Sequence, residues 1–396
     1  INSLKKGVLV GFTLKPVQGD ALVDREKIIR EMVATLADPG VEMGFALVGC
    51  RRMGKTSILL EVCRQLKQKK NIIPVYFSLW DLVEGTLEEF TQFLSVAILD
   101  AYENRLSLKL KAKNLLKVPL ETIKEVLTEA KVGIKIKEEV ELLFSPGRLK
   151  KRAVEDLARV FELPESLANH TNTKCVLALD EFPSIIDLKN GAHIGEGAIR
   201  KIRTIHEQQR RTTLCISGSI RKTMEIAALS SGSPFYRQFV VREIGPLGQM
   251  DIERLIRRNL NKPIVKEALE KIVKFTSGIP FYAQFLGREL SGAGEQEVTS
   301  KSIDKAVEQF IEEEGNIIFK EEFEKLGPKE RKVVTLMATQ ELSSPSQIAK
   351  AMGQEPNKIA TYLEYLEAKG VIEKPERGKY RLIDPVFKSW LARKYS

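Results

Sequence analysis

Apolar residues along the chain alternate between short continuous runs and longer stretches of helical spacing. The continuous runs have the length and composition of strands buried on both faces, and they occupy residues 45–48, 71–77, 174–179 and 213–216. Between these runs, apolar positions three and four apart predict amphipathic helices. Strands and helices that alternate in this way predict an α/β fold with a doubly wound parallel sheet, which closes around residues 241–246.

Two parts of the chain depart from this alternation. Residues 86–170 are mostly of helical pattern and predict an insertion or elaboration of the α/β core, within which residues 132–137 alternate like an exposed strand. Beyond residue 246 the pattern is helical, with breaks at Gly278 and Pro280 and again near Gly292. We therefore expect an α/β core over residues 1–246, with its insertion at about 86–170, and a helical domain over residues 247–324.

The last part of the chain, residues 325–396, predicts a winged helix-turn-helix. A first helix covers residues 329–338, and Ser344 with Pro345 supplies the N-cap and first position of a short second helix. A third helix begins at Pro356 and is capped by Gly370. Residues 371–374 and 379–383 then pair across a turn, which would form the wing.

A phosphate-binding loop follows the first predicted strand. Residues 49–57 read G-C-R-R-M-G-K-T-S and match the template G-x-x-x-x-G-K-[ST] at every position. The glycines allow consecutive amide groups to face an anion, Lys55 would reach the β- and γ-phosphates, and the hydroxyl of Thr56 would ligate Mg²⁺. A Gly-rich turn without ligand is the alternative, but strand, loop and helix come in the order that a phosphate site needs. The expected nucleotide contacts are Gly49, Cys50, Arg51, Arg52, Met53, Gly54, Lys55, Thr56 and Ser57.

A second candidate set of residues follows two later strands. Asp180 and Glu181 end the apolar run at 174–179, where Asp180 would hold Mg²⁺ and Glu181 would orient or deprotonate the attacking water. A solvated acidic turn is the alternative interpretation. Because a kinase uses its substrate as nucleophile and needs no such base, the adjacent glutamate favours hydrolysis. Ser217, or else Ser219, follows the strand at 213–216 and would bind the water or the γ-phosphate, unless it caps the next helix.

Composition is that of a globular protein with two or three domains. The chain has 396 residues, of which 43% are hydrophobic and 29% charged. No apolar run approaches the length of a membrane span, and no signal-peptide pattern is present, so we expect no membrane association. The four cysteines form no C-x-x-C pair, which favours reduced thiols in a cytoplasmic protein, and three histidines without a cysteine neighbour make a zinc site unexpected.

The formal charge of +10 is concentrated in two segments. Residues 105–152 hold thirteen Lys or Arg against six Glu, and residues 325–396 hold fourteen against eight Asp or Glu. The first segment suits nucleic acid or an acidic partner, with a solvated lysine-rich surface as the alternative. In the second, the wing and third helix offer a set of cations for double-stranded DNA, with domain packing or protein binding as the alternative. These cations are Lys358, Lys374, Arg377, Lys379 and Arg381.

Together these motifs resemble the archaeal ATPase family, a branch of the AAA+-related STAND class of P-loop (ASCE) ATPases. The resemblance covers the chain from about residue 20 onward and rests on Asp24-Arg25-Glu26, the phosphate loop, Leu-Asp-Glu-Phe-Pro at 179–183, Ser-Gly-Ser at 217–219, residues 233–237 and Gly278-Ile279-Pro280. It implies that Asp24 and Arg25 lie near the adenine and that Gly278 and Pro280 carry the helical domain over the nucleotide as a lid. Arg237 would contact the γ-phosphate or a neighbouring subunit of a homo-oligomer, although the family has this arginine one position later.

Two functions follow from the sequence. The first is an ATPase that binds ATP or ADP with Mg²⁺, turns over slowly without a partner, and controls its lid and winged helix by nucleotide state. The second is an initiator-like DNA-binding protein in which ATP is mainly a structural ligand. Glu181 favours the first function, and the basic wing favours the second.

Overall fold

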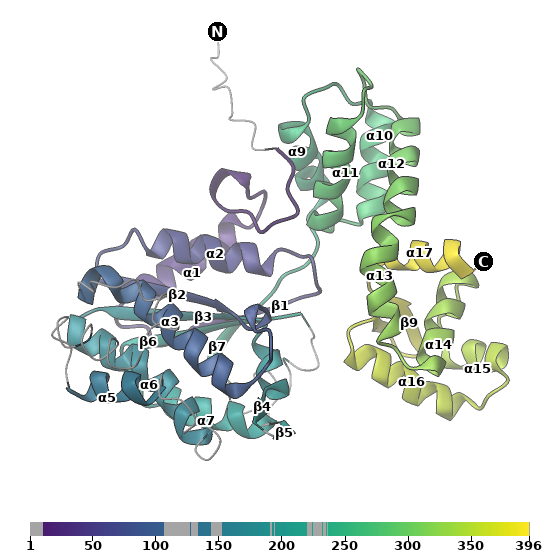
Figure 1. Ribbon diagram of the computed structural model, residues 1–396. Coiled ribbons are helices and arrows are strands. Elements are labelled where there is room, and N and C mark those ends of the chain that lie inside the picture. Colours follow the sequence, from purple (N-terminus) through teal and green to yellow (C-terminus); the bar gives the residue numbers. More distant parts are fainter. Residues whose placement is uncertain are drawn as a thin grey trace, which may run out of the picture.

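The computed structural model describes residues 11–106, 127, 134–143, 153–190, 192–193, 195–219, 224, 232, 235 and 237–395. A five-stranded sheet lies at the centre of the first part of the chain, with strand order β2-β3-β6-β1-β7 (Figure 1). Every adjacent pair in it is parallel. The strands are β1 Gly44–Val48, β2 Ile72–Ser78, β3 Lys174–Asp180, β6 Thr212–Gly218 and β7 Phe239–Glu243. The predicted α/β fold with a parallel sheet is therefore confirmed.

Helices cover both faces of this sheet, as parallel strands require. One face packs against α1 (Glu26–Ala37) and α2 (Lys55–Leu66), through side chains such as Met32 and Val62. The other face is covered by α3 (Leu87–Leu106), α5 (Ile134–Leu143), α6 (Ala153–Thr171) and α7 (Glu196–His206). Short 3₁₀ turns, η1 (Gly19–Ala21), η2 (Leu79–Asp81) and η5 (Phe182–Asp187), and the small strands β4 (Lys189–Asn190) and β5 (Ala192–His193) complete this part.

One predicted strand is wrong. Residues 134–137 begin helix α5 instead of an exposed strand, and residues 132–133 lie outside the described residues. The two apolar positions Ile134 and Ile136 suggested alternation, yet Ile134 is 75% exposed whereas Ile136 and Val140 are buried. A spacing of four residues places Ile136 and Val140 on one helical face, and α5 packs against α6.

The second part of the chain is helical. It contains α9 (Gln249–Asn259), α10 (Lys266–Thr276), α11 (Pro280–Gly292) and α12 (Ser300–Glu312), which we call the lid. The lid has its own apolar core and lies beside the N-terminal segment in Figure 1. Gly278 joins α10 to α11 with φ of 79°, and a Cβ there would lie 2.3 Å from the carbonyl oxygen of Leu247. Only glycine permits both that backbone angle and that close approach.

The C-terminal part has the predicted winged helix arrangement. After α13 (Glu314–Glu324) come α14 (Pro328–Thr339), α15 (Pro345–Met352), α16 (Pro356–Ala368), the hairpin β8 (Ile372–Glu376) and β9 (Lys379–Leu382), and α17 (Pro385–Tyr395). Ser344 caps α15 by accepting from the backbone N–H of Gln347, and Gly353 ends it in a left-handed conformation. Helix α17 packs back on α13, where the rings of Trp390 and Phe319 lie 5.9 Å apart.

Candidate functional site

The phosphate loop runs from the end of β1 to the start of α2, and its two glycines occupy positions that disfavour other residues. Gly54 has φ of 89°, and a Cβ at Gly49 would lie 2.3 Å from the carbonyl oxygen of Ile244. Helix α2 begins at Lys55, so its N-terminal amide groups face the loop. The sequence motif therefore folds into a tight turn that leads directly into the N-terminus of α2.

Lys55 is buried against its own loop. Its Nζ donates to the carbonyl oxygens of Gly49 and Cys50, at 2.9 Å each, and the residue is only 5% exposed. Burial lowers the pKa of Lys55, while the charges of Glu181 and Asp180 act in the opposite direction. The ammonium group thus lies where it could exchange its carbonyl partners for phosphate oxygens.

Asp180 gathers three hydroxyl groups. One carboxylate oxygen accepts from Thr56 at 2.6 Å and from Tyr76 at 3.0 Å, and the other accepts from Ser217. Thr56 and Asp180 therefore stand side by side at the end of β3 and the start of α2. A hydroxyl and a carboxylate are the hard oxygen ligands that Mg²⁺ prefers, so this pair fits the ion.

Glu181 has different surroundings from its neighbour. It lies just past β3 with φ of 51°, and its carboxylate accepts from the hydroxyl of Ser219 at 2.9 Å and from the Ser219 backbone N–H at 3.3 Å. Burial raises the pKa of Glu181, opposed by Lys55 and by the Ser219 hydrogen bond. The two candidate serines thus bind different carboxylates: Ser217 donates a hydrogen bond to Asp180, and Ser219 donates one to Glu181.

A cavity of about 350 Å³, which we call the nucleotide cavity, opens beside these residues. Gly54, Lys55, Thr56, Ser57 and Glu181 line it from the α/β core, and Pro280, Phe281 and Gln284 line it from the lid. Residues 13–17 form a further part of its wall. Sequence reasoning missed this segment because it is short, lacks periodicity and carries no recognisable motif.

Three residues implied by the family resemblance do not line this cavity in the described part of the chain. Arg25 donates to the carbonyl oxygen of Gly245 at 2.5 Å and pairs with Asp24 at 3.3 Å, which ties the start of α1 to the chain after β7. Neither residue lines the nucleotide cavity as the described residues define it. Arg237 is exposed, has φ of 61°, and lies outside that lining as well.

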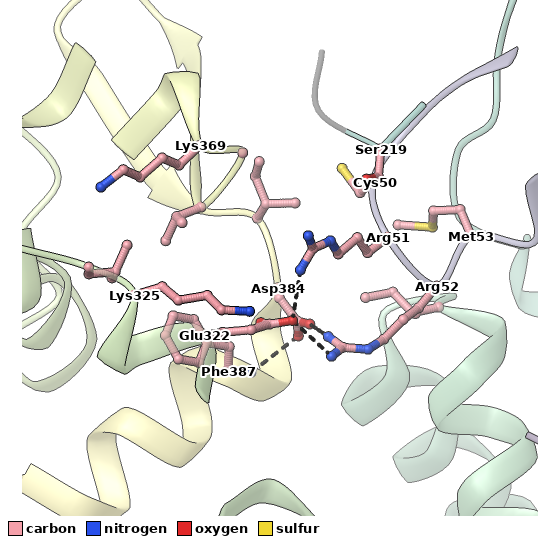
Figure 2. A pocket seen from close by; sticks show the side chains of 15 residues that line it. Cys50, Arg51, Arg52, Met53, Ser219, Glu322, Lys325, Lys369, Asp384 and Phe387 are labelled. Atoms are coloured by element: carbon pink, nitrogen blue, oxygen red, sulfur yellow. Dashed lines mark hydrogen bonds and ion pairs between the residues drawn. The ribbon is translucent and has the colours of Figure 1, made fainter. Parts of the chain in front are cut away.

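The arginines of the phosphate loop contact the C-terminal part of the chain. Figure 2 shows Arg51 and Arg52 reaching toward Glu322 of α13 and Asp384, which precedes α17. Arg52 lies 3.1 Å from Glu322 and 3.1 Å from Asp384, and Arg51 lies 3.4 Å from Glu322. Tyr282 of the lid contacts both sides of these ion pairs. Its hydroxyl accepts a hydrogen bond from Arg52 at 3.2 Å and donates one to Asp384. We call these five residues the arginine latch.

The latch borders a second cavity, of about 310 Å³, between the phosphate loop and the winged helix (Figure 2). Cys50 and Met53 face it from the loop, and Val371, Ile383 and Phe387 face it from the C-terminal part. Burial raises the pKa of the Cys50 thiol. The phosphate loop therefore lies between two cavities, one suited to nucleotide and one shared with the winged helix.

The candidate DNA-binding residues are on the surface, but two of them are already paired. Lys379 lies 2.9 Å from Glu376, and Arg381 pairs with Glu373 across the hairpin. The ammonium group of Lys374 lies 5.5 Å from the centre of the Tyr380 ring. Lys358 on α16 and Arg377 at the wing tip are exposed. The wing is therefore less basic in effect than its composition indicates.

Comparisons with known proteins bear on the fold. A family model described as a domain of unknown function (DUF8462) matches residues 316–391, which run from α13 into α17. No curated protein matches the chain. None of the described helices is long and apolar enough to cross a bilayer.

Solved structures match over nearly the whole chain. The Walker-type ATPase PABY2304 of Pyrococcus abyssi is 18% identical, with 96% of this chain and 99% of that chain covered and a TM-score of 0.69. The ORC2 protein of Aeropyrum pernix in ADPNP–ADP complexes is 12% identical, with 96% and 97% covered and a TM-score of 0.56. Its ADP form is 13% identical, with 93% of each chain covered and a TM-score of 0.50. The chain therefore has the fold of a Walker-type P-loop ATPase of the AAA+ kind, with a helical lid and a C-terminal winged helix.

Proposed function

We propose that the chain binds ATP with Mg²⁺, hydrolyses it, and uses nucleotide state to control how the lid and winged helix sit on the α/β core. The observation that carries this proposal is the arginine latch. Arg51 and Arg52 belong to the loop that would hold phosphates, and their carboxylate partners belong to α13 and the start of α17. One loop thus serves both the nucleotide and the C-terminal part of the chain.

Each residue of the site has a separate role in the proposed hydrolysis. Lys55 binds the phosphates, Thr56 and Asp180 hold Mg²⁺, and Glu181 orients the attacking water and accepts its proton. Mg²⁺ supplies positive charge against the phosphate oxygens when bound. Ser219 holds the Glu181 carboxylate in place, and Ser217 holds that of Asp180.

Electrostatics explains how nucleotide would act on the latch. Phosphates bound in the loop place negative charge close to Arg51 and Arg52, where they compete with Glu322 and Asp384 for the guanidinium groups. The same phosphates repel the two carboxylates. ATP and ADP differ in charge, so they bias the latch to different degrees, which is the requirement for a switch. We expect slow turnover without a partner, since a switch must keep its ATP state.

Two variants test the assignment. Lys55→Ala removes a charge-assisted contact worth about 2–3 kcal/mol, so ATP affinity measured by calorimetry should fall tens- to hundredfold.

Glu181→Gln keeps the shape of the site but removes the base, so ATP should bind as in the wild type while hydrolysis falls by roughly 10²-fold or more. Unchanged affinity in the first variant or unchanged turnover in the second would refute the corresponding role.

DNA binding by the winged helix is a second candidate function. It is favoured by the surface of α16, on which Asn357, Lys358 and Thr361 are exposed, beside a wing that presents Lys374 and Arg377. In that case ATP would serve mainly to fix the arrangement of the domains. Arg237, exposed and away from the nucleotide cavity, remains our candidate for contact with a second copy of the chain.

A further inference from the structure

The N-terminal segment Phe12–Gly19 connects the lid to the phosphate-loop helix and forms part of the nucleotide cavity between them. In Figure 1 it is the dark purple stretch between α2 and α11. We infer that this segment is a strap that positions the lid over the nucleotide, with Gln284, Gly287 and Ser57 as its positioning residues. The inference rests on the proposed function, because it assigns a role within the same ATP site.

The strap is fastened to the lid at two points on α11. The backbone N–H of Thr13 donates to Oε1 of Gln284 at 3.1 Å, and Gln284 is buried. One residue earlier, the ring of Phe12 lies over Gly287, where a Cβ would come within 2.1 Å of the ring. The ring of Phe12 therefore packs directly on Gly287, and any larger residue at position 287 would occupy the space of the ring.

The other end of the strap is fastened to α2. The backbone N–H of Val17 donates to the hydroxyl of Ser57 at 3.0 Å, and that of Gly19 donates to Glu61 at 2.7 Å. Glu61 is itself held by Arg64 and Gln65, which lowers its pKa to about 2 and keeps it ionised. Ser57 directly follows Thr56, so this anchor lies on the first turn of the helix that receives the phosphates.

The strap is short, so it limits the distance between the lid and α2. Thr13 and Val17 are four residues apart, so the chain between the two anchors spans at most about 14 Å when fully extended. Pro16 restricts that stretch further by fixing its own φ. The lid therefore cannot swing far from α2 unless an anchor breaks. Because Leu14, Lys15 and Pro16 line the nucleotide cavity, a bound nucleotide packs against the strap that sets the position of the lid.

The test uses a pair of matched substitutions on α11. In Gly287→Ala the new methyl group would displace the ring of Phe12 from its contact with α11. Neither Gly287 nor Phe12 lines the nucleotide cavity as the described residues define it. In Gly292→Ala, at the end of the same helix, the Cβ meets nothing within 4 Å. Alanine favours helix over glycine, so neither substitution should weaken α11 as a helix. We expect Gly287→Ala to raise the Kd and KM for ATP by about tenfold, while kcat at saturating ATP stays near wild type. The nucleotide-free melting temperature should fall in this variant, because the displaced ring no longer packs on the apolar core of the lid.

A double-substitution cycle identifies the cause. Phe12→Ala should reproduce the loss of ATP affinity, and Gly287→Ala should add nothing once the ring is gone. Wild-type ATP affinity in Gly287→Ala would overturn the strap, as would equal losses in Gly287→Ala and Gly292→Ala. If the wild-type protein itself failed to bind ATP, the proposed function would fall instead, so the two failures are distinguishable.

Discussion

At the scale of single residues, the site assigns different environments to two adjacent carboxylates. Asp180 accepts hydrogen bonds from Thr56, Tyr76 and Ser217, whereas Glu181 is held by Ser219. Burial raises the pKa of Glu181, and a carboxyl of raised pKa is better able to take a proton. The environments, more than the residue types, thus separate the proposed metal ligand from the proposed base.

These environments predict a pH dependence. If Glu181 is the base that we propose, it acts only when ionised. Burial raises its pKa, so kcat should fall with decreasing pH at values above the ordinary glutamate pKa of about 4.3. Ser219→Ala removes a hydrogen bond that lowers this pKa, so the acid limb of the kcat profile should move to higher pH. Ser219→Thr keeps the hydroxyl and serves as the control. An acid limb at the same pH in wild type and Ser219→Ala would contradict this assignment.

At the scale of elements, ion pairs within the hairpin β8–β9 reduce the positive charge that the hairpin presents to a partner. Four cations lie on or beside it, but Lys379 and Arg381 face Glu376 and Glu373 in exposed ion pairs. Such pairs contribute little to stability, yet they reduce the positive potential that a phosphate backbone would meet. Lys374 and Arg377 are therefore the wing residues best suited to DNA.

This difference can be measured with two double variants. If the wing contacts DNA, replacing Lys374 and Arg377 by Ala should weaken binding to all sequences and reduce the salt slope by about 0.9 for each lost phosphate contact. Replacing Lys379 and Arg381 by Ala should have a smaller effect, because their charges are already compensated. Fluorescence anisotropy on a mixed-sequence duplex at low and moderate salt provides the comparison. Identical curves for the wild type and both variants would leave the winged helix as a packing or partner module.

At the scale of the whole molecule, one apolar cluster extends from the sheet into the winged helix. Phe45 of β1, Tyr282 of the lid and Trp390 of α17 all belong to it. The arginine latch lies at the edge of this cluster, where Arg52 also stacks against Phe281 and Phe319, with its guanidinium carbon 5.5 Å from each ring centre. The domains are thus held by apolar packing together with the ion pairs of the arginine latch.

Asp384 allows the latch to be tested without damaging the winged helix. One of its oxygens accepts from the backbone N–H groups of Val386 and Phe387 at the start of α17, and the other binds Arg52. Asp384→Asn keeps the helix cap, since Asn is also a good N-cap residue, but removes the charge. We expect a larger radius of gyration by solution X-ray scattering without nucleotide, and ATP affinity about fivefold higher, because the latch no longer competes.

A comparison with Asp384→Ala separates the two roles of this side chain. Loss of the cap should cost about 1 kcal/mol of stability, seen as a lower melting temperature in Asp384→Ala than in Asp384→Asn. Scattering and ATP affinity equal to wild type in Asp384→Asn would mean that the arginine latch does not hold the domains.

The sequence by itself determined those features that depend on contiguous residues. The phosphate loop, the buried parallel strands and the caps of α15 could be predicted because their hydrogen bonds and close contacts form within a few residues of one another. The placement of Asp180 beside Thr56 also followed, since a parallel sheet brings the carboxyl ends of its strands to one edge.

Only the tertiary structure decided which distant residues meet. Arg52 and Asp384 are separated by 332 positions and Thr13 and Gln284 by 271, and no local pattern marks either pair. The partner of Ser217 depended on the register of β6 against β3, and the helical state of residues 134–143 depended on burial against α6. Local preferences decide turns, caps and strands, but contacts across the molecule depend on how completed elements pack, which no short stretch of sequence contains.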